Sequence, residues 1–264
     1  MEWEDKELQD LETAMELLES PGFIARVSGL VGTPIEYVLE RLPKGAGDQI
    51  TKAVQVSLRA AVDTALKTLG THSRGRPWLK SHMAAAGLSG GVGGVFGLAA
   101  LPIELPITTT IILRSIADIA RSEGEDLQAS EARLACLEVF AMGGPSAGDD
   151  AAESGYFAVR AALARAVSEA AKYVAGRTVV EDGAPVIVRL LAQIAARFNT
   201  VVGEKIVAQG VPVVGALGGA TINVLFIDHF QDIARGHFIV RRLERRHGED
   251  EVRKSYDQLL AGRE

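Results

Sequence analysis

The chain reads Gly-Leu-Ser-Gly-Gly-Val-Gly-Gly-Val-Phe-Gly at residues 87–97 and Leu-Pro-Ile-Glu-Leu-Pro at residues 101–106, followed by a long apolar segment. The glycines form three overlapping Gly-x-x-x-Gly pairs. In a helix this spacing leaves one face without side chains, so that another backbone can approach closely. Gly215 and Gly219 repeat the spacing later in the chain. The pattern predicts tightly packed central helices.

The composition favours helices. Hydrophobic residues make up 47% of the 264 residues and aromatic residues only 5%, so Ala, Leu, Val and Ile dominate the apolar part. The net charge of −6 argues against nucleic-acid binding, which needs a concentrated basic face. The single cysteine, Cys136, excludes an internal disulfide and is typical of a reducing compartment. We therefore expect a cytoplasmic protein.

Apolar periodicity and Gly/Pro breaks predict an all-α, multi-helix bundle. We divide it into an N-terminal amphipathic helical region, residues 1–44, and a helical domain, residues 45–264. The predicted helices cover residues 3–20, 23–30, 34–42, 48–69, 105–122, 127–142, 150–175, 186–202, 221–246 and 249–261.

A short repeated tetrapeptide raises the question whether the chain consists of two related halves. Asp-Ile-Ala-Arg occurs at residues 118–121 and again at residues 232–235, each time within a long predicted helix. The matches are too short to distinguish duplication from chance.

Two segments of the sequence carry no charge, Met83 to Ile103 and Ile206 to Ile227. Each of these charge-free windows is as long as the roughly 20 residues that a helix needs to cross a bilayer. Basic residues precede the first window and follow the second, which the positive-inside rule would place on one side of a membrane. Prolines, polar residues and glycines make both windows only weakly hydrophobic. Buried helices of a compact domain and partial membrane insertion are therefore both open.

Isolated polar residues in apolar surroundings are candidates for a polar pocket inside the bundle. Glu104, between two prolines, is expected either to cap the following helix or to face such a pocket. Asp228 and Asp232 lie one turn apart and would repel each other unless a positive group lies between them. No metal-binding motif is present, and we predict no metal site. The candidate pocket residues are Glu104, Thr108, Arg114, Asp118, Asn223, Asp228, His229 and Asp232.

A basic segment follows the second window. Its arginines are Arg235, Arg241, Arg242, Arg245 and Arg246. The segment has one aromatic residue and no Asn or Gln to contact bases, so an acidic lipid surface or a membrane protein is a better partner than nucleic acid.

Nucleotide and catalytic motifs are absent from the sequence. No Gly-x-x-x-x-Gly-Lys-Ser/Thr occurs, and Gly91-Val92-Gly93 leads to Phe96 where a dinucleotide fingerprint needs glycine. Whether the protein is an enzyme stays open, and we predict no cofactor.

Two segments resemble the bacterial EcsC family. One runs from Leu101 to Thr110 and into the Arg114–Ala120 helix, and the other runs from Val211 to Asn223 and on to His229, Ala234–Phe238 and Arg242–Glu244. The resemblance covers roughly residues 45–260. The founding member is encoded beside the subunits of an ABC-type exporter, but the resemblance implies no established activity and no agreed catalytic residues.

The sequence thus predicts an EcsC-like protein at or near the cytoplasmic membrane face, peripheral to or partly inserted in the inner membrane. It would be a membrane-associated or transporter-linked accessory protein. The alternative is an enzyme or small-ligand binder that uses the polar pocket. A homo-oligomer held by the glycine faces is a third hypothesis.

Overall fold

The computed structural model describes residues 3–20, 22–31, 45–69, 100–144, 155–175, 184–209 and 218–262. Within these ranges the chain is α-helical without a strand, which confirms the all-α prediction. The helices are α1 (Asp5–Leu18), α2 (Phe23–Val31), α4 (Ala46–Thr68), α6 (Leu101–Ser122), α7 (Ser130–Met142), α8 (Gly155–Val174), α9 (Pro185–Gln209), α11 (Gly218–His247) and α12 (Glu249–Ala261).

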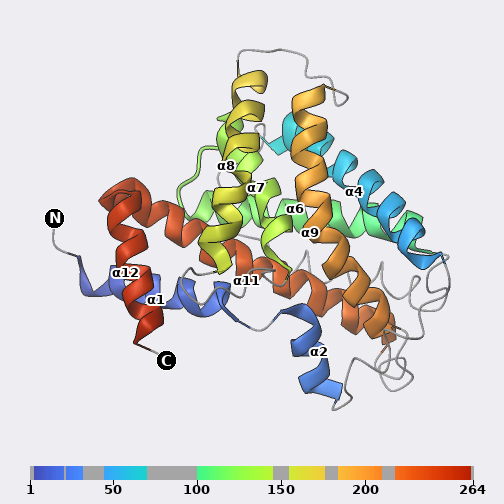
Figure 1. Cartoon of the computed structure of the whole chain (residues 1–264), viewed down its shortest axis with the longest axis horizontal. Helices are drawn as coiled ribbons and strands as arrows, with labels where there is room; N and C mark the ends of the chain where they lie inside the picture. Colours follow the sequence, from blue (N-terminus) through green and yellow to red (C-terminus); the bar gives the residue numbers. More distant parts are fainter. Residues whose placement is uncertain are drawn as a thin grey trace.

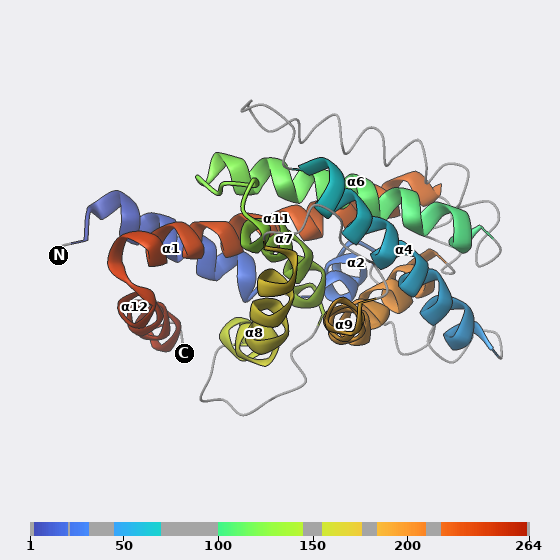
Figure 2. The same cartoon turned by 90° about the horizontal axis from the view of Figure 1, so that it is seen from above.

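The 30-residue helix α11 runs along the length of the molecule. Helices α4 and α6 pack against each other and α6 lies beside α11, while α8 and α9 cross this layer steeply (Figures 1 and 2). Helix α1 lies along the C-terminal part of α11, and α12 follows it there. Both described ends of the chain are therefore at the same end of the molecule.

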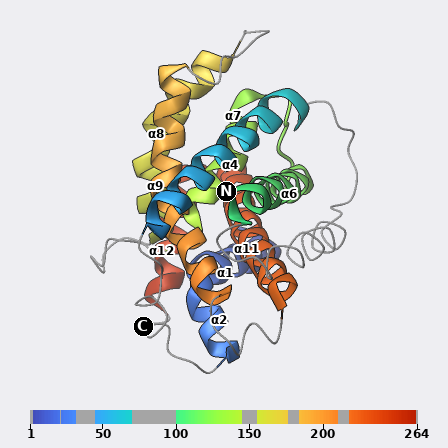
Figure 3. The ribbon, with the colours of Figure 1, turned by 90° about the vertical axis from the view of Figure 1, so that its right-hand side faces the viewer.

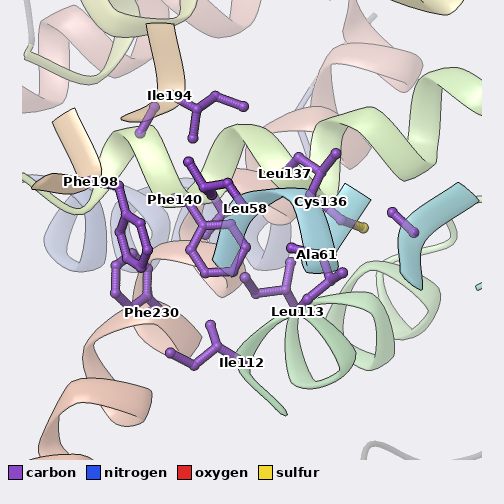
Figure 4. Close-up of a cluster of buried hydrophobic side chains, with 14 of the residues drawn as sticks. Leu58, Ala61, Ile112, Leu113, Cys136, Leu137, Phe140, Ile194, Phe198 and Phe230 are labelled. Atoms are coloured by element: carbon purple, nitrogen blue, oxygen red, sulfur yellow. The ribbon is translucent and has the colours of Figure 1, made fainter. Parts of the chain in front are cut away.

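Aromatic rings fill the centre of the core, where α7, α9 and α11 meet (Figure 4). The rings of Phe140 and Phe198 lie 5.1 Å apart, and those of Phe198 and Phe230 lie 5.7 Å apart, both edge to face. This geometry suits the quadrupoles of the rings. Leu58 of α4 and Leu113 of α6 also belong to this cluster, so one apolar core joins these helices.

A second, smaller apolar cluster joins α1, α8, α11 and α12 through residues such as Leu11, Tyr156, Leu243 and Tyr256. Here α1 approaches α11 closely at Gly236. A Cβ at that position would lie 2.6 Å from Leu18 Cγ and 2.9 Å from the Ala14 carbonyl oxygen. A glycine therefore does permit a close helix crossing, although it lies outside the predicted Gly-x-x-x-Gly runs.

The glycine runs themselves lie almost wholly outside the described residues. This holds for residues 87–97 and for Gly215, and only the ends of the two charge-free windows are described, in α6, α9 and α11. The predicted helix over residues 34–42 also lies outside them. The boundary at residue 44 stays a prediction, although α1 packs on α11.

Helix α6 begins four residues earlier than predicted, at Leu101. Pro102 is tolerated because it occupies the first turn, where backbone N–H groups have no intrahelical acceptor. Pro106 lies inside the helix, one turn later. The N-cap is Ala100, and Glu104 lies within the first turn, where the helix dipole favours a carboxylate.

Candidate functional site

Glu104 and Lys205 form a buried ion pair between α6 and α9. Lys205 Nζ donates a hydrogen bond of 2.6 Å to Glu104 Oε1, and Lys205 is fully buried. The ammonium also lies 4.9 Å from the centre of the Phe226 ring of α11, a cation–π contact. Burial lowers the pKa of Lys205, and the Glu104 carboxylate opposes that shift. Each charge thus depends on the other for its stability in the interior.

The three consecutive threonines of α6, residues 108–110, differ in the hydrogen bonds of their hydroxyl groups. The Thr110 hydroxyl donates to the Pro106 carbonyl at 2.8 Å, as expected for a threonine one turn later in a helix. The hydroxyls of Thr108 and Thr109 are buried without a hydrogen-bond partner among the described residues. Asn223, near the start of α11, is also buried.

The carboxylates of Asp228 and Asp232 are balanced by arginines. Arg26 of α2 donates a 2.8 Å hydrogen bond to Asp232, and Arg235 donates a 3.3 Å bond to the same carboxylate. Burial and the neighbouring Asp232 raise the pKa of Asp228, while the two arginines lower it. The positive group that the sequence required here is therefore supplied mainly by a residue more than 200 positions away.

His229 lies at a small cavity. Its Nε2 donates to the Gly143 carbonyl at 2.7 Å, which leaves the lone pair on Nδ1 without a partner among the described residues. Burial lowers the pKa of His229 to about 4, so the ring is neutral at pH 7. The cavity measures about 130 Å³, and its lining also includes Glu19, Ser20 and Tyr156.

Asp118 pairs with Arg121 on its own helix at 2.8 Å, and Arg121 also donates to the Leu69 carbonyl at 2.8 Å. Arg114 is exposed. Glu104, Asp118 and Asp232 thus each have a different ionic partner, and Arg114 points to solvent instead of into a shared pocket. The described residues contain no group of three His, Cys, Asp or Glu side chains able to hold a metal ion.

The five arginines of the basic segment all bind groups within the chain. Arg235 binds Asp232, Arg241 binds Glu125, Arg242 binds Asp10 and Glu123, Arg245 binds Glu125, and Arg246 binds Glu4 and Glu7. Their acidic partners come mainly from α1 and from the loop between α6 and α7. The basic segment is therefore largely neutralised in the folded chain.

The most unusual titratable group is one that the sequence analysis did not select. Glu138 lies on α7 and is only 6% exposed. Burial raises its pKa to about 7, against the attraction of Arg241 and Arg160. A carboxyl group that titrates near neutral pH is a candidate functional group.

The two arginines that attract the Glu138 carboxylate, Arg160 and Arg241, each bind another carboxylate. Arg160 of α8 binds both oxygens of Glu244 at 2.6 and 3.0 Å, and Arg241 binds both oxygens of Glu125 at 2.9 and 3.4 Å. Bidentate geometry fixes the planes of both partners. Side chains of α8, α11 and the α6–α7 loop are thereby held in one charged array.

The array extends inward to Tyr156 and His237. The Tyr156 hydroxyl lies 3.0 Å from His237 Nδ1 and receives a 3.3 Å hydrogen bond from Arg160. Burial and the charges of Arg160 and Arg241 hold the pKa of His237 well below its usual range. Burial likewise raises the pKa of the Cys136 thiol, as expected for an inert cysteine.

A cleft of about 450 Å³ opens above this array. We call it the α7–α11 cleft. It is lined by Gly124, Glu125, Asp126, Ala129, Glu131, Ala132, Arg160, Arg241, Glu244, Arg245 and Glu249. A signal for Glu138 existed in the sequence, because this residue is the only charge in the apolar run Leu134 to Met142. Its surroundings come from three other segments and were not visible in that pattern.

One family comparison gave a match. A family model described as the EcsC protein family matches residues 4–243 of the 264-residue chain. The match begins in the N-terminal region, well before the motifs quoted above. No curated protein and no solved structure matches the chain.

Proposed function

The chain belongs to the EcsC protein family, and on this basis we propose that it acts at the cytoplasmic face of the inner membrane. It would be a membrane-associated or transporter-linked accessory protein. The observation that carries the proposal is an exposed apolar surface at the end of the molecule to which both charge-free windows connect.

The ends of α6, α9 and α11 meet at this point, on the right in Figure 1 and facing the viewer in Figure 3. The contacts of Lys205 with Glu104 and Phe226 join the three helices there. The first window ends at Ile103 in α6, and the second runs from the end of α9 into α11. Both charge-free segments therefore connect to the same end of the folded body.

Ile103 and Ile107 lie one turn apart on α6 and are 72% and 48% exposed. Isolated exposed apolar residues are common, but these two side chains are neighbours on one helix face and form one apolar surface. Transfer of such a surface from water to the headgroup–acyl boundary of a bilayer is favourable. This favours shallow insertion of this end of the molecule.

The arginines of α11 contribute less to the proposal. They are paired with carboxylates, and the axis of α11 separates Arg242 from Ile222 by about 30 Å. Among the described helices, α9 is long and apolar enough to span a bilayer, which is weak support by itself. Much of α9 packs in the core, and it carries Lys205. We therefore assign membrane attachment to the surface formed by Ile103 and Ile107, which we call the isoleucine surface.

Flotation with vesicles of phosphatidylethanolamine and phosphatidylglycerol tests the proposal. We expect the purified protein to float with the vesicles at low and at high salt, because apolar insertion is not screened by ions. Replacing Ile103 and Ile107 together by Ser should abolish flotation. Val188→Ser is the matched control, since Val188 is 47% exposed near the start of α9. Flotation that only low salt permits would contradict this mode of attachment.

A further inference from the structure

The exposed face of α6 continues beyond the isoleucine surface and ends at an arginine. With 3.6 residues per turn, Ile107 and Arg114 lie within about 40° of Ile103 around the helix axis, and all three side chains are exposed. The half-buried residues along this face are Pro106, Thr110 and Ile111. The Thr110 hydroxyl already donates to the Pro106 carbonyl, so its polar group is satisfied within the helix. Arg114 is therefore the first charge on an otherwise apolar face.

Arg114 differs from the arginines of α11 because it has no carboxylate partner within the part of the chain that the structure describes. The nearest carboxylate along this face, that of Asp118 one turn later, receives a 2.8 Å hydrogen bond from Arg121. The guanidinium group of Arg114 is therefore available to an external anion. A guanidinium group binds phosphate through two parallel hydrogen bonds, which makes phosphate a well-matched partner.

The chain as a whole is acidic, so an attraction to anions must be local. Its net charge of −6 opposes the approach of an anionic surface. Exposed charges more than about 10 Å away are largely screened at 0.1 M salt, however, so the groups nearest the contact decide. Between Leu101 and Arg114 the only carboxylate is Glu104, which is buried and paired with Lys205. Along this part of α6, an anion therefore meets a cation and no exposed carboxylate.

These observations specify the lipid for the membrane attachment proposed above, on which this inference rests. We propose that α6 lies against the bilayer along this face, with Ile103 and Ile107 below the headgroups and Arg114 bound to the phosphate of an anionic phospholipid. Arg114 is about 16 Å from Ile103 along the helix axis. An arginine at the edge of an apolar surface keeps its methylene groups on that surface and extends its charge to the headgroups. Anionic lipids are preferred because no cationic group of the headgroup compensates their phosphate.

Flotation of the whole chain with two kinds of vesicle at low salt tests the contact. One kind contains phosphatidylcholine alone, and the other contains equal parts of phosphatidylcholine and phosphatidylglycerol. Arg114→Gln should bind the anionic vesicles about fivefold more weakly than the wild type, which is the contribution of one arginine near an anionic surface. It should bind the phosphatidylcholine vesicles like the wild type. High salt should remove the difference between the two proteins while both still float.

Lys254→Gln is the matched control, since Lys254 is also an exposed cation but lies on α12, at the other end of the molecule (Figure 1). This variant should bind both kinds of vesicle like the wild type. An equal loss of binding for Lys254→Gln would overturn the proposal, because net charge and not Arg114 would then set the lipid preference.

The remaining outcomes separate this contact from the proposed function. If Arg114→Gln floats like the wild type with both kinds of vesicle, the phosphate contact is wrong and the apolar attachment stands. If the wild type floats with neither, both proposals fail. A dimer in lipid-free buffer that Ile103→Ser with Ile107→Ser converts to a monomer would assign this face to a second copy of the chain and would also overturn the proposal.

Discussion

At the scale of single residues, the interior of this protein holds an ion pair between Glu104 of α6 and Lys205 of α9. Glu104 was recognisable as an isolated carboxylate between two prolines. Its partner Lys205 lies 101 residues away, in a helix that looks merely apolar. Helical spacing can relate residues within one helix, but it says nothing about which distant helix supplies the opposite charge.

The dependence of Glu104 on Lys205 leads to a stability prediction. Lys205→Met should lower the free energy of unfolding by about 3–5 kcal/mol, because it leaves an uncompensated carboxylate in the interior. The double variant Glu104→Leu with Lys205→Met should recover most of that loss, since both buried charges are then gone. Urea unfolding at neutral pH measures both values. A double variant no more stable than the single one would contradict this account of the pair.

At the scale of helices, the sequence predicted where helices lie along the chain better than it predicted which helices pack together. The range 249–261 is the same in prediction and structure, and α4 and α11 differ from their predictions by a few residues at each end. Periodicity suffices for this because each amphipathic face is a local feature. The predicted start of α6 at residue 105 is wrong by four residues, because the helix already includes Pro102 in its first turn.

The crossing of α1 over α11 depends on Gly236. Gly236→Ala should lower the free energy of unfolding by about 1–3 kcal/mol, because the new methyl group would overlap Leu18 and the Ala14 backbone. Gly203→Ala in α9 is the control, since no atom lies within 4 Å of the added Cβ. That variant should be slightly more stable than the wild type because alanine favours helix. Chemical denaturation of both variants measures the difference, and equal effects would contradict a close crossing.

Glu138 gives the junction of α7, α8 and α11 a characteristic pH dependence. Its folded-state pKa is raised to about 7, so its contribution to stability is fully present below the unfolded value and is lost as the pH rises through 7. Glu138→Gln should therefore be more stable than the wild type by up to about 3 kcal/mol at about pH 8 and similar to it at about pH 5. Denaturation curves at several pH values check this. A difference independent of pH would show that Glu138 is not desolvated.

At the scale of the whole molecule, composition and periodicity were enough for the fold class, and the resemblance of two motifs indicated the family. They could not show how the surface charges are distributed. The basic segment of α11 looked like a surface for anionic lipids, yet acidic residues of α1 and of the α6–α7 loop bind its arginines. The family match that starts at residue 4 includes α1, in keeping with its packing on α11.

Because the arginines near the C-terminal end of α11 are paired, we place the proposed membrane contact near the N-terminal end of this helix. Paired arginines at one end and exposed isoleucines at the other predict an attachment that is apolar rather than electrostatic. Salt would release a protein held by charges and would leave an inserted apolar surface in place. The two modes of attachment can therefore be separated in cells.

Cell fractionation with a high-salt wash tests the central claim most directly. We predict that the wild-type protein stays with the membrane fraction through the wash. The variant with Ile103→Ser and Ile107→Ser should move to the soluble fraction, and Val188→Ser should behave like the wild type. A wild-type protein found in the soluble fraction, or released by salt alone, would contradict attachment through the isoleucine surface.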